Sequence, residues 1–525
     1  MTRLFCAASA LALTAGVASA DFTLTILHTN DIHSRIESIN KYDSTCDAEG
    51  ETEGKCFGGV ARIKAAVDMK RAEMEDQNVI LLDAGDPFQG SLFYTTYKGA
   101  AEAEFMEAIG YDAMAVGNHE FDDGPEGLAG FIDAVTFPVI SGNLDLSAEA
   151  LLDGKVLNHV VLEVGGEKIG VISALATDTV DTSSPGENVI FRDEIEALAE
   201  DVATLEAEGV NKIIALTHVG LPMDLRIAEA VPGIDVIVGG HSHTLLSNTS
   251  DRASGAYPMM VGDTAVAQAY AYSKYLGNLT VTFDDDGNVV SAEGEPMLLD
   301  ASVEPDADML ARVAEMGTPI EEMKQRVVAD AADAIEGARD VCRAMECAMG
   351  NLVADAMLDS VKDQGYTIAI QNGGGLRASI DAGEVTMGEV LTVLPFQNTL
   401  STFKVPGQVV IDALENGVSQ VEDGKGRFPQ VAGLKYTFDM SVAPLEGRIS
   451  EVMVMEGDAW VPIDPGKTYG LVSNNYVRGG GDGYAMFREA EEFYDYGPDL
   501  ADVTAAFLAA NAPYAPYTDG RITRK

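Results

Sequence analysis

Short apolar runs alternate with stretches of helical character over the first three hundred residues of the chain. The helical stretches include Ala61–Glu75 and Ile195–Glu208. Five apolar runs have the continuous hydrophobicity of strands that are buried on both faces. They are Phe22–Leu27, Val79–Leu82, Ala113–Val116, Lys212–Leu216 and Asp235–Val238. Strands that alternate with helices predict an α/β domain with a parallel or mixed sheet.

The pattern changes near residue 306. Gly277–Pro296, with the turn sequence Asp284-Asp285-Asp286-Gly287-Asn288, predicts a hairpin that ends the first domain. Pro305–Arg326 is acidic, rich in Ala and Met and without strand character, so we expect a linker helix. A second domain follows, with a helix over Asn351–Lys362 and a strand over Thr367–Gln371.

A length of 525 residues also favours two domains. The expected division is a leader at 1–20, a first domain at 21–306, a linker helix at 307–325 and a second domain at 326–525.

Polar residues follow each of the five buried runs directly. The motifs are Asp31-Ile32-His33, Gly85-Asp86-Pro87, Gly117-Asn118-His119-Glu120, Thr217-His218 and Gly240-His241-Ser242-His243. The carboxyl ends of parallel strands share one rim of a sheet, so these side chains are expected to converge. Asp, His and Asn without Cys form a ligand set for divalent metals that activate water at phosphorus or carbon. The sequence therefore predicts a two-metal hydrolase. The two remaining histidines, His28 and His159, are expected to be packing or hydrogen-bonded residues.

The first twenty residues have the organisation of a signal peptide. Arg3 gives a positive start, Leu4–Val17 is apolar, and Ala18-Ser19-Ala20 is a small-residue cleavage site before Asp21. The apolar run is too short to span a bilayer, and no later run is long enough. Cys6 lies near the start of this run and not at the cleavage point, where a lipid anchor would need it. We expect a soluble mature protein in the periplasm or the medium.

Four cysteines remain in the mature chain, as the close pairs Cys46 with Cys56 and Cys342 with Cys347. An even number in an exported protein favours two disulfides that close small loops. Zinc ligation is the alternative, but the pairs are far apart in sequence and have no local His.

The formal net charge is −50, which argues against nucleic-acid polymers and anionic membranes as partners because both need a basic surface. An anionic phosphate substrate then requires positive charge supplied locally, and metal ions are usually the largest local charges in a site.

Two glycine-rich motifs of the second domain complete a recognisable set. Asn372-Gly373-Gly374-Gly375-Leu376-Arg377 and Gly480-Gly481-Asp482-Gly483 follow the first-domain motifs in order. Together these motifs resemble the exported 5′-nucleotidase family of the calcineurin-like metallophosphoesterase superfamily. That family includes animal ecto-5′-nucleotidases and bacterial periplasmic 5′-nucleotidase/UDP-sugar hydrolases. The resemblance covers essentially the whole mature chain. It implies an α/β fold with an N-terminal metallophosphoesterase β-sandwich flanked by helices, a linker helix and a smaller α/β C-terminal substrate-binding domain.

The resemblance also implies two metal sites that share Asp86. The first would be held by Asp31, His33, Asp86 and His243, and the second by Asp86, Asn118, His218 and His241. His243 stands where known members carry Gln or Asn, so the choice among Zn, Mn and Co stays open. His119 and Asp122 resemble the catalytic dyad of the family. A cationic His119, oriented by Asp122, would stabilise charge that builds on the phosphoryl oxygens.

In the second domain the resemblance assigns the nucleotide contacts. Arg343, Asn372 and Arg377 match residues that hold the phosphate region, Phe396 and Tyr476 match the aromatic pair around the base, and Asp482 matches the acceptor for ribose hydroxyls. Tyr476 replaces the usual Phe. Gly479 replaces an Asn of some relatives, so no base preference is implied. A disulfide between Cys342 and Cys347 would position Arg343.

The expected activity is extracytoplasmic release of phosphate from nucleoside 5′-monophosphates, and from di- or triphosphates, by metal-activated water. UDP-sugars, dinucleotides or 2′,3′-cyclic nucleotides are alternative substrates of the same family. A relative that acts on a sulfur-carrier protein fits less well, because the arginine and aromatic set would then have no purpose. A non-catalytic nucleotide-binding surface protein is the alternative from another class, and the intact His119 and Asp122 argue against it. The oligomeric state stays open, with a monomer favoured.

Overall fold

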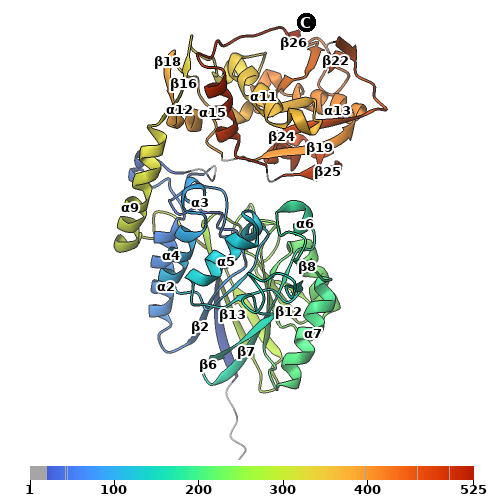
Figure 1. The fold of residues 1–525 in the computed structure, drawn as a ribbon. Helices are drawn as coiled ribbons and strands as arrows, with labels where there is room; N and C mark the ends of the chain where they lie inside the picture. Colours follow the sequence, from blue (N-terminus) through green and yellow to red (C-terminus); the bar gives the residue numbers. More distant parts are fainter. Residues whose placement is uncertain (1–20, 42, 44, 397, 458, 496) are drawn as a thin grey trace, which may run out of the picture.

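The computed structural model describes residues 21–525 apart from 42, 44, 397, 458 and 496. The expected signal peptide and Cys6 therefore lie outside the described residues. The chain forms two domains with helix α9 between them (Figure 1). Within the described part of the chain, no helix is long and apolar enough to cross a membrane.

Two stacked sheets form the centre of the first domain. The first sheet has the order β14-β13-β1-β2-β3-β4, with β15 beside β13. Its strands are β1 (Phe22–Thr29), β2 (Asn78–Asp83), β3 (Ala113–Ala115), β4 (Val139–Ile140), β13 (Tyr275–Phe283), β14 (Val289–Gly294) and β15 (Met297–Leu298). The second sheet has the order β11-β12-β10-β9-β7-β6. Its strands are β6 (His159–Val164), β7 (Glu167–Leu175), β9 (Ile213–His218), β10 (Val236–Gly239), β11 (Met259–Val261) and β12 (Thr264–Ala267).

Helices cover the outer face of each sheet. The first sheet carries α2 (Val60–Glu73), α4 (Ala100–Ile109) and α5 (Gly124–Ala134), and the second carries α7 (Glu194–Ala207) and α8 (Leu221–Ala230). Leu24 and Ile26 of β1 are buried between the sheets, whereas Leu27 joins the core under the helices. Side chains of successive residues point to opposite faces of a strand, so β1 contributes to both cores. The expected β-sandwich flanked by helices is confirmed.

The expectation of a single sheet rim is wrong in one respect. Strands β1, β2 and β3 belong to the first sheet, whereas β9 and β10 belong to the second. The polar motifs therefore converge from the carboxyl ends of two stacked sheets. A continuous apolar run shows that both faces of a strand are buried, but it does not show which strand pairs with it.

Helix α9 (Ala307–Lys324) packs against the first domain along one face. Its residues Met309, Val313, Met316 and Ile320 join the core under α2 and α3 (Leu92–Tyr97). Their spacing of three and four residues places them on one side of the helix. The Arg312 guanidinium also lies 2.6 Å from the Glu104 carboxylate of α4. The helix thus extends the first core towards the second domain.

The second domain is built on a sheet of the order β20-β17-β24-β19-β25. Its strands are β17 (Ile368–Asn372), β19 (Leu400–Pro406), β20 (Pro429–Ala432), β24 (Thr468–Asn474) and β25 (Glu491–Tyr494). Helices α11 (Ala348–Val361), α12 (Met387–Val393) and α15 (Leu500–Ala510) pack on one face. The other face packs on α13 (Gly407–Gly417) and a sheet of the order β23-β22-β21-β26. The remaining strands of this domain are β16 (Val327–Ala331), β18 (Gly383–Thr386), β21 (Leu434–Phe438), β22 (Ile449–Glu456), β23 (Ala459–Pro462) and β26 (Ile522–Arg524).

Candidate active site

The seven expected metal ligands converge at the carboxyl ends of five strands. Asp31 and His33 follow β1, Asp86 follows β2, Asn118 follows β3, His218 ends β9, and His241 and His243 follow β10. The side chains form three groups, and within each group the possible ligand atoms all lie within 4.8 Å of one another. The groups are Asp31 with His33 and His243, His33 with Asp86 and His119, and Asp86 with His218 and His241. The structure therefore brings together residues that are more than two hundred positions apart.

The donor atoms face one another closely. The Nε2 atoms of His33 and His243 lie 2.9 Å apart, and His243 Nε2 lies 3.2 Å from Asp31 Oδ1. Among the ligands expected for the second metal, His241 Nδ1 lies 2.9 Å from Asn118 Oδ1.

The His218 ring gives a direct test of whether cations fit these groups. Its Nδ1 lies 2.7 Å from the Ala84 carbonyl, which leaves Nε2 to face Asp86 Oδ2 at 3.1 Å. Nε2 is buried and, although it is at ion-pair distance from Asp86, it has no well-aligned hydrogen bond to any of the described residues. A buried nitrogen without such a bond, among carboxylate and imidazole donors, fits a divalent cation of the borderline type.

The loops that carry the ligands have an uncommon backbone. Asp31, His33, Asp86, His241 and His243 all have φ between 49° and 70°, in the left-handed region. This region is uncommon for residues other than glycine, and such residues concentrate at functional sites. Neighbouring glycines make the tight packing possible, since a Cβ on Gly117 would lie 2.2 Å from Asp86 Oδ1. Backbone strain is thus concentrated where the ligands meet.

Glu120 is a residue of the site to which the sequence assigned no role. Its buried carboxylate accepts the backbone N–H groups of Asp86 at 3.0 Å, Gly117 at 2.7 Å and Phe88 at 3.3 Å. It therefore ties the loop after β2 to the loop after β3. The Gly-Asn-His-Glu motif contains Glu120, but only the fold shows that it binds another loop.

His119 and Asp122 form a close pair at the edge of the ligand cluster. His119 Nδ1 lies 2.7 Å from Asp122 Oδ2, and the hydroxyl of Ser183 donates to Asp122 Oδ1 at 2.8 Å. Burial lowers the pKa of His119, but the charges of Asp122 and Asp86 outweigh burial and raise it to about 9. The imidazole is therefore cationic at neutral pH. No local sequence signal predicted Ser183, which lies 61 positions from Asp122.

A cavity of about 540 Å³ lies between the two domains. Its second-domain wall includes all six expected nucleotide contacts: Arg343, Asn372, Arg377, Phe396, Tyr476 and Asp482. An adjoining cavity of about 370 Å³ contains the expected metal ligands His33, Asp86, Asn118, His241 and His243, together with His119. His243, Phe396 and Tyr476 line both cavities. The two halves of the expected site therefore border two adjoining cavities that share part of their walls.

Several residues around this space were not expected from the sequence. On the first-domain side, the Arg35 guanidinium lies 5.1 Å from the centre of the Tyr272 ring, and both residues line both cavities. On the second-domain side, Arg478 forms an ion pair with Asp495 beside the ligand cluster. Arg35 directly follows the Asp-Ile-His-Ser segment, which is the one local signal among these residues.

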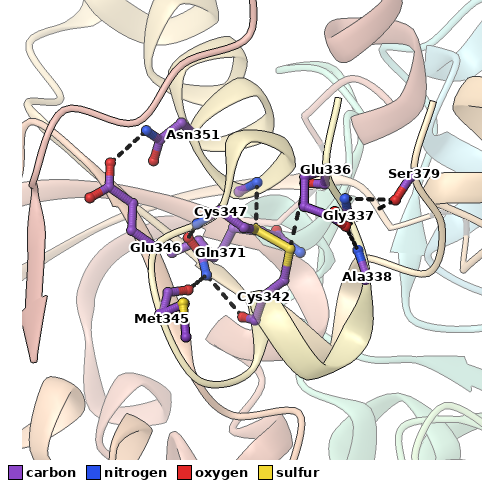
Figure 2. Close-up of a disulfide and its surroundings, with 12 residues drawn as sticks. Glu336, Gly337, Ala338, Cys342, Met345, Glu346, Cys347, Asn351, Gln371 and Ser379 are labelled. Atoms are coloured by element: carbon purple, nitrogen blue, oxygen red, sulfur yellow. Dashed lines mark hydrogen bonds between the residues drawn. A yellow bond between two sulfur atoms is a disulfide. The ribbon is translucent and has the colours of Figure 1, made fainter. Parts of the chain in front are cut away.

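The loop that carries Arg343 is closed by a disulfide. Figure 2 shows the bond between Cys342 and Cys347, whose Cα atoms lie 5.2 Å apart. Inside the loop, the buried Gln430 amide donates to the carbonyls of Cys342 at 2.9 Å and Met345 at 2.8 Å. A second disulfide joins Cys46 to Cys56. Both cysteine pairs are therefore disulfides, and the zinc alternative for them is wrong.

Comparison with known proteins gives matches to both domains. Residues 24–245 match the family described as calcineurin-like phosphoesterase, and residues 327–489 match the 5′-nucleotidase C-terminal domain. A 5′-nucleotidase from Diplobatis ommata is 38% identical over 530 residues, which cover 96% of this chain and 90% of that protein. The crystal structure of a 5′-nucleotidase precursor from Thermus thermophilus is 40% identical with a TM-score of 0.65, over 96% of this chain and 99% of that one. The Haemophilus influenzae NAD nucleotidase structure is 28% identical with a TM-score of 0.74, over 96% and 99% of the two chains.

Proposed function

This chain belongs to the 5′-nucleotidase family and is a phosphoric monoester hydrolase, and we propose that it releases phosphate from nucleoside 5′-monophosphates outside the cytoplasm. One observation carries the proposal. The cavity beside the Asp and His cluster of the first domain adjoins the cavity lined by Arg343, Arg377, Phe396 and Tyr476 of the second, and the two share lining residues. A phosphate at the cluster and a base between the rings would then belong to one molecule.

We propose that two divalent cations are held at the cluster. Asp31, His33, Asp86 and His243 would hold one, and Asp86, Asn118, His218 and His241 would hold the other. When bound, such cations supply Lewis-acid stabilisation of phosphoryl oxygens and lower the pKa of water. The two cations would carry four positive charges, of which the carboxylates of Asp31 and Asp86 neutralise two. The site would therefore keep a net attraction for a phosphate monoester. With His243 each cation would have two imidazole ligands, which favours Zn, Mn or Co over Mg or Ca.

The other proposed roles belong to the chain's own side chains. The cationic His119, with Nδ1 against Asp122, would present its Nε2–H to a phosphoryl oxygen. Arg343 and Arg377 would donate to phosphate oxygens, because a planar guanidinium offers paired donors. Phe396 and Tyr476 would stack on the base.

Replacement of both rings by alanine tests the substrate assignment. Stacking of a base is worth about 1–3 kcal/mol, so kcat/KM for a nucleoside monophosphate is expected to fall roughly 5- to 150-fold in Phe396→Ala/Tyr476→Ala, mainly through KM. Hydrolysis of 4-nitrophenyl phosphate, which lacks a base, is expected to change much less. Equal losses on both substrates would show that the rings do not contact a base, and the substrate would then be an unspecified phosphoester.

A second candidate activity is hydrolysis of dinucleotides or UDP-sugars. The larger cavity continues past the six nucleotide contacts to Arg35, Tyr270 and Tyr272 of the first domain. On this wall the Arg35 guanidinium and the two tyrosine rings could contact a second moiety of a larger substrate. The Haemophilus relative is named for activity on NAD. A panel of monophosphates, UDP-glucose, dinucleotides and 2′,3′-cyclic nucleotides, assayed for phosphate and nucleoside products, separates these substrates.

We further propose that the mature protein is exported, either to the periplasm or to the medium, after cleavage behind Ala20. The two disulfides support this, because such bonds persist in oxidising compartments. Mass mapping of unreduced peptides from protein secreted by its host is expected to find Asp21 at the N-terminus. It should also find the pairs Cys46–Cys56 and Cys342–Cys347. Free thiols at either pair, or an N-terminus that retains residues 1–20, would contradict this proposal.

A further inference from the structure

The hydroxyl of Tyr476 is bonded to the residue expected to contact the ribose. It donates to Asp482 Oδ1 at 3.2 Å and accepts the backbone N–H of Asp482 at 3.1 Å. The other carboxylate oxygen, Oδ2, accepts from the Asn372 amide at 2.8 Å. Burial and the charge of Asp482 raise the pKa of Tyr476, so its hydroxyl stays protonated as a donor.

The backbone at Asp482 is left-handed, with φ of 52° and ψ of 23°. Aspartate is one of the few residues with a side chain that adopt this conformation, because its short polar side chain can form local hydrogen bonds. The Tyr476 ring lies over the neighbouring Gly481, where a Cβ would be 2.4 Å from the ring. The ring and the hydroxyl thus hold this turn from the same side. A phenylalanine ring would keep the packing and lose both hydrogen bonds.

The hydrogen-bonding capacity of the carboxylate defines what else it can bind. An ionised carboxylate has about four acceptor positions, and Tyr476 and Asn372 occupy one on each oxygen. Counting the described residues, one position remains on each oxygen, which matches a vicinal pair of hydroxyls. Gly374 and Gly426 flank Oδ2, and a Cβ on either would lie within 3.3 Å of it. Both glycines line the larger cavity, so the carboxylate stays open to a ligand.

We propose that the Tyr476 hydroxyl is a specificity-determining group that holds the Asp482 carboxylate in position for the 2′,3′-diol of a ribonucleotide. This role is separate from stacking, which needs only the ring, and it rests on the proposed nucleotidase function. A phenylalanine at this position would lack the group. Tyr476 thereby increases the discrimination between a ribonucleotide and an analogue that lacks the diol, through the position of Asp482.

Tyr476→Phe tests the role of the hydroxyl because it keeps the ring. The measurement is kcat/KM for a ribonucleoside 5′-monophosphate divided by kcat/KM for its 2′,3′-dideoxy analogue, with the base that the parent protein prefers. This ratio is expected to fall about 10-fold, the effect of one hydrogen bond to a charged group, through KM of the ribonucleotide. An unchanged ratio, or a loss confined to kcat, would overturn the proposal.

Two further variants exclude a general structural effect. Tyr517→Phe removes another hydrogen bond from a tyrosine hydroxyl to a carboxylate, that from Tyr517 to Asp355 Oδ2 at 2.5 Å. Tyr517 is in the same domain and lines neither cavity. It is expected to leave the ratio unchanged. In an Asp482→Asn background, Tyr476→Phe is expected to have little additional effect on the ratio, whereas independent effects of the two changes would overturn the coupling. If the parent hydrolyses nucleotides and only the ratio test fails, the proposed function stands and this inference does not. If the parent hydrolyses no nucleotide, both fail.

Discussion

Asp86→Ala is expected to remove both metal ions and nearly all phosphate release. The Asp86 carboxylate lies 3.1 Å from His218 Nε2 and 3.9 Å from His33 Nε2, and it belongs to two of the three ligand groups. Loss of a shared ligand weakens both sites at once. The expected loss of activity exceeds about 10⁴-fold, above the range for a single acid–base group. Elemental analysis of the purified variant measures the metal content, and phosphate release from a nucleotide measures the activity.

Asp86→Asn and Asp123→Asn make this experiment specific. Asp86 has φ of 60°, which asparagine tolerates better than alanine does, so Asp86→Asn loses the charge with little backbone strain. It should also lose metal. Asp123, which follows Asp122 in the chain, is the matched control: its side chain is 41% exposed and accepts a hydrogen bond from the Tyr94 hydroxyl. Asp123→Asn is expected to keep both ions. Two tightly bound ions and full activity in either Asp86 variant would show that Asp86 does not bridge two metals.

His119→Ala is expected to lower turnover by about 10²–10⁴-fold, the range for charge-stabilising or acid–base groups. Asp122 Oδ2 lies 2.7 Å from Nδ1 of the ring, and Nε2 is the atom proposed to act on the substrate. Metal content is expected to match that of the parent protein. Asp122→Asn should also lower turnover, because it removes the charge that keeps His119 cationic.

Metal content decides between two roles for His119. Its ligand atom lies within 4.8 Å of those of His33 and Asp86, so the residue is close enough to bind a cation. A stoichiometric loss of one ion in His119→Ala would make it a ligand. His33→Ala is the matched comparison, because that variant is expected to lose metal.

Local pattern was sufficient for most elements of the first domain. The run Phe22–Leu27 lies within β1, and the Asp284–Asn288 turn joins β13 to β14. The expected helix Ala61–Glu75 is found as α2, Val60–Glu73. These elements depend on burial and turn chemistry within a few residues, which the order of amino acids records directly. The ligand motifs were found for the same reason, since each is a short segment after a strand.

Contacts between distant segments were decided by the tertiary structure alone. The stacking of two sheets brings the His243 side chain and the His241 backbone N–H onto Asp31. Glu120 joins two loops through backbone N–H groups that carry no side-chain signal. The bond from Ser183 to Asp122 and the approach of the Tyr476 hydroxyl to Asp482 depend equally on the paths of their loops. The sequence by itself determined which side chains were available and on which strand ends they stand. Only the packing of the sheets and domains decided which of them meet, because hydrophobic periodicity records whether a face is buried and not what lies against it.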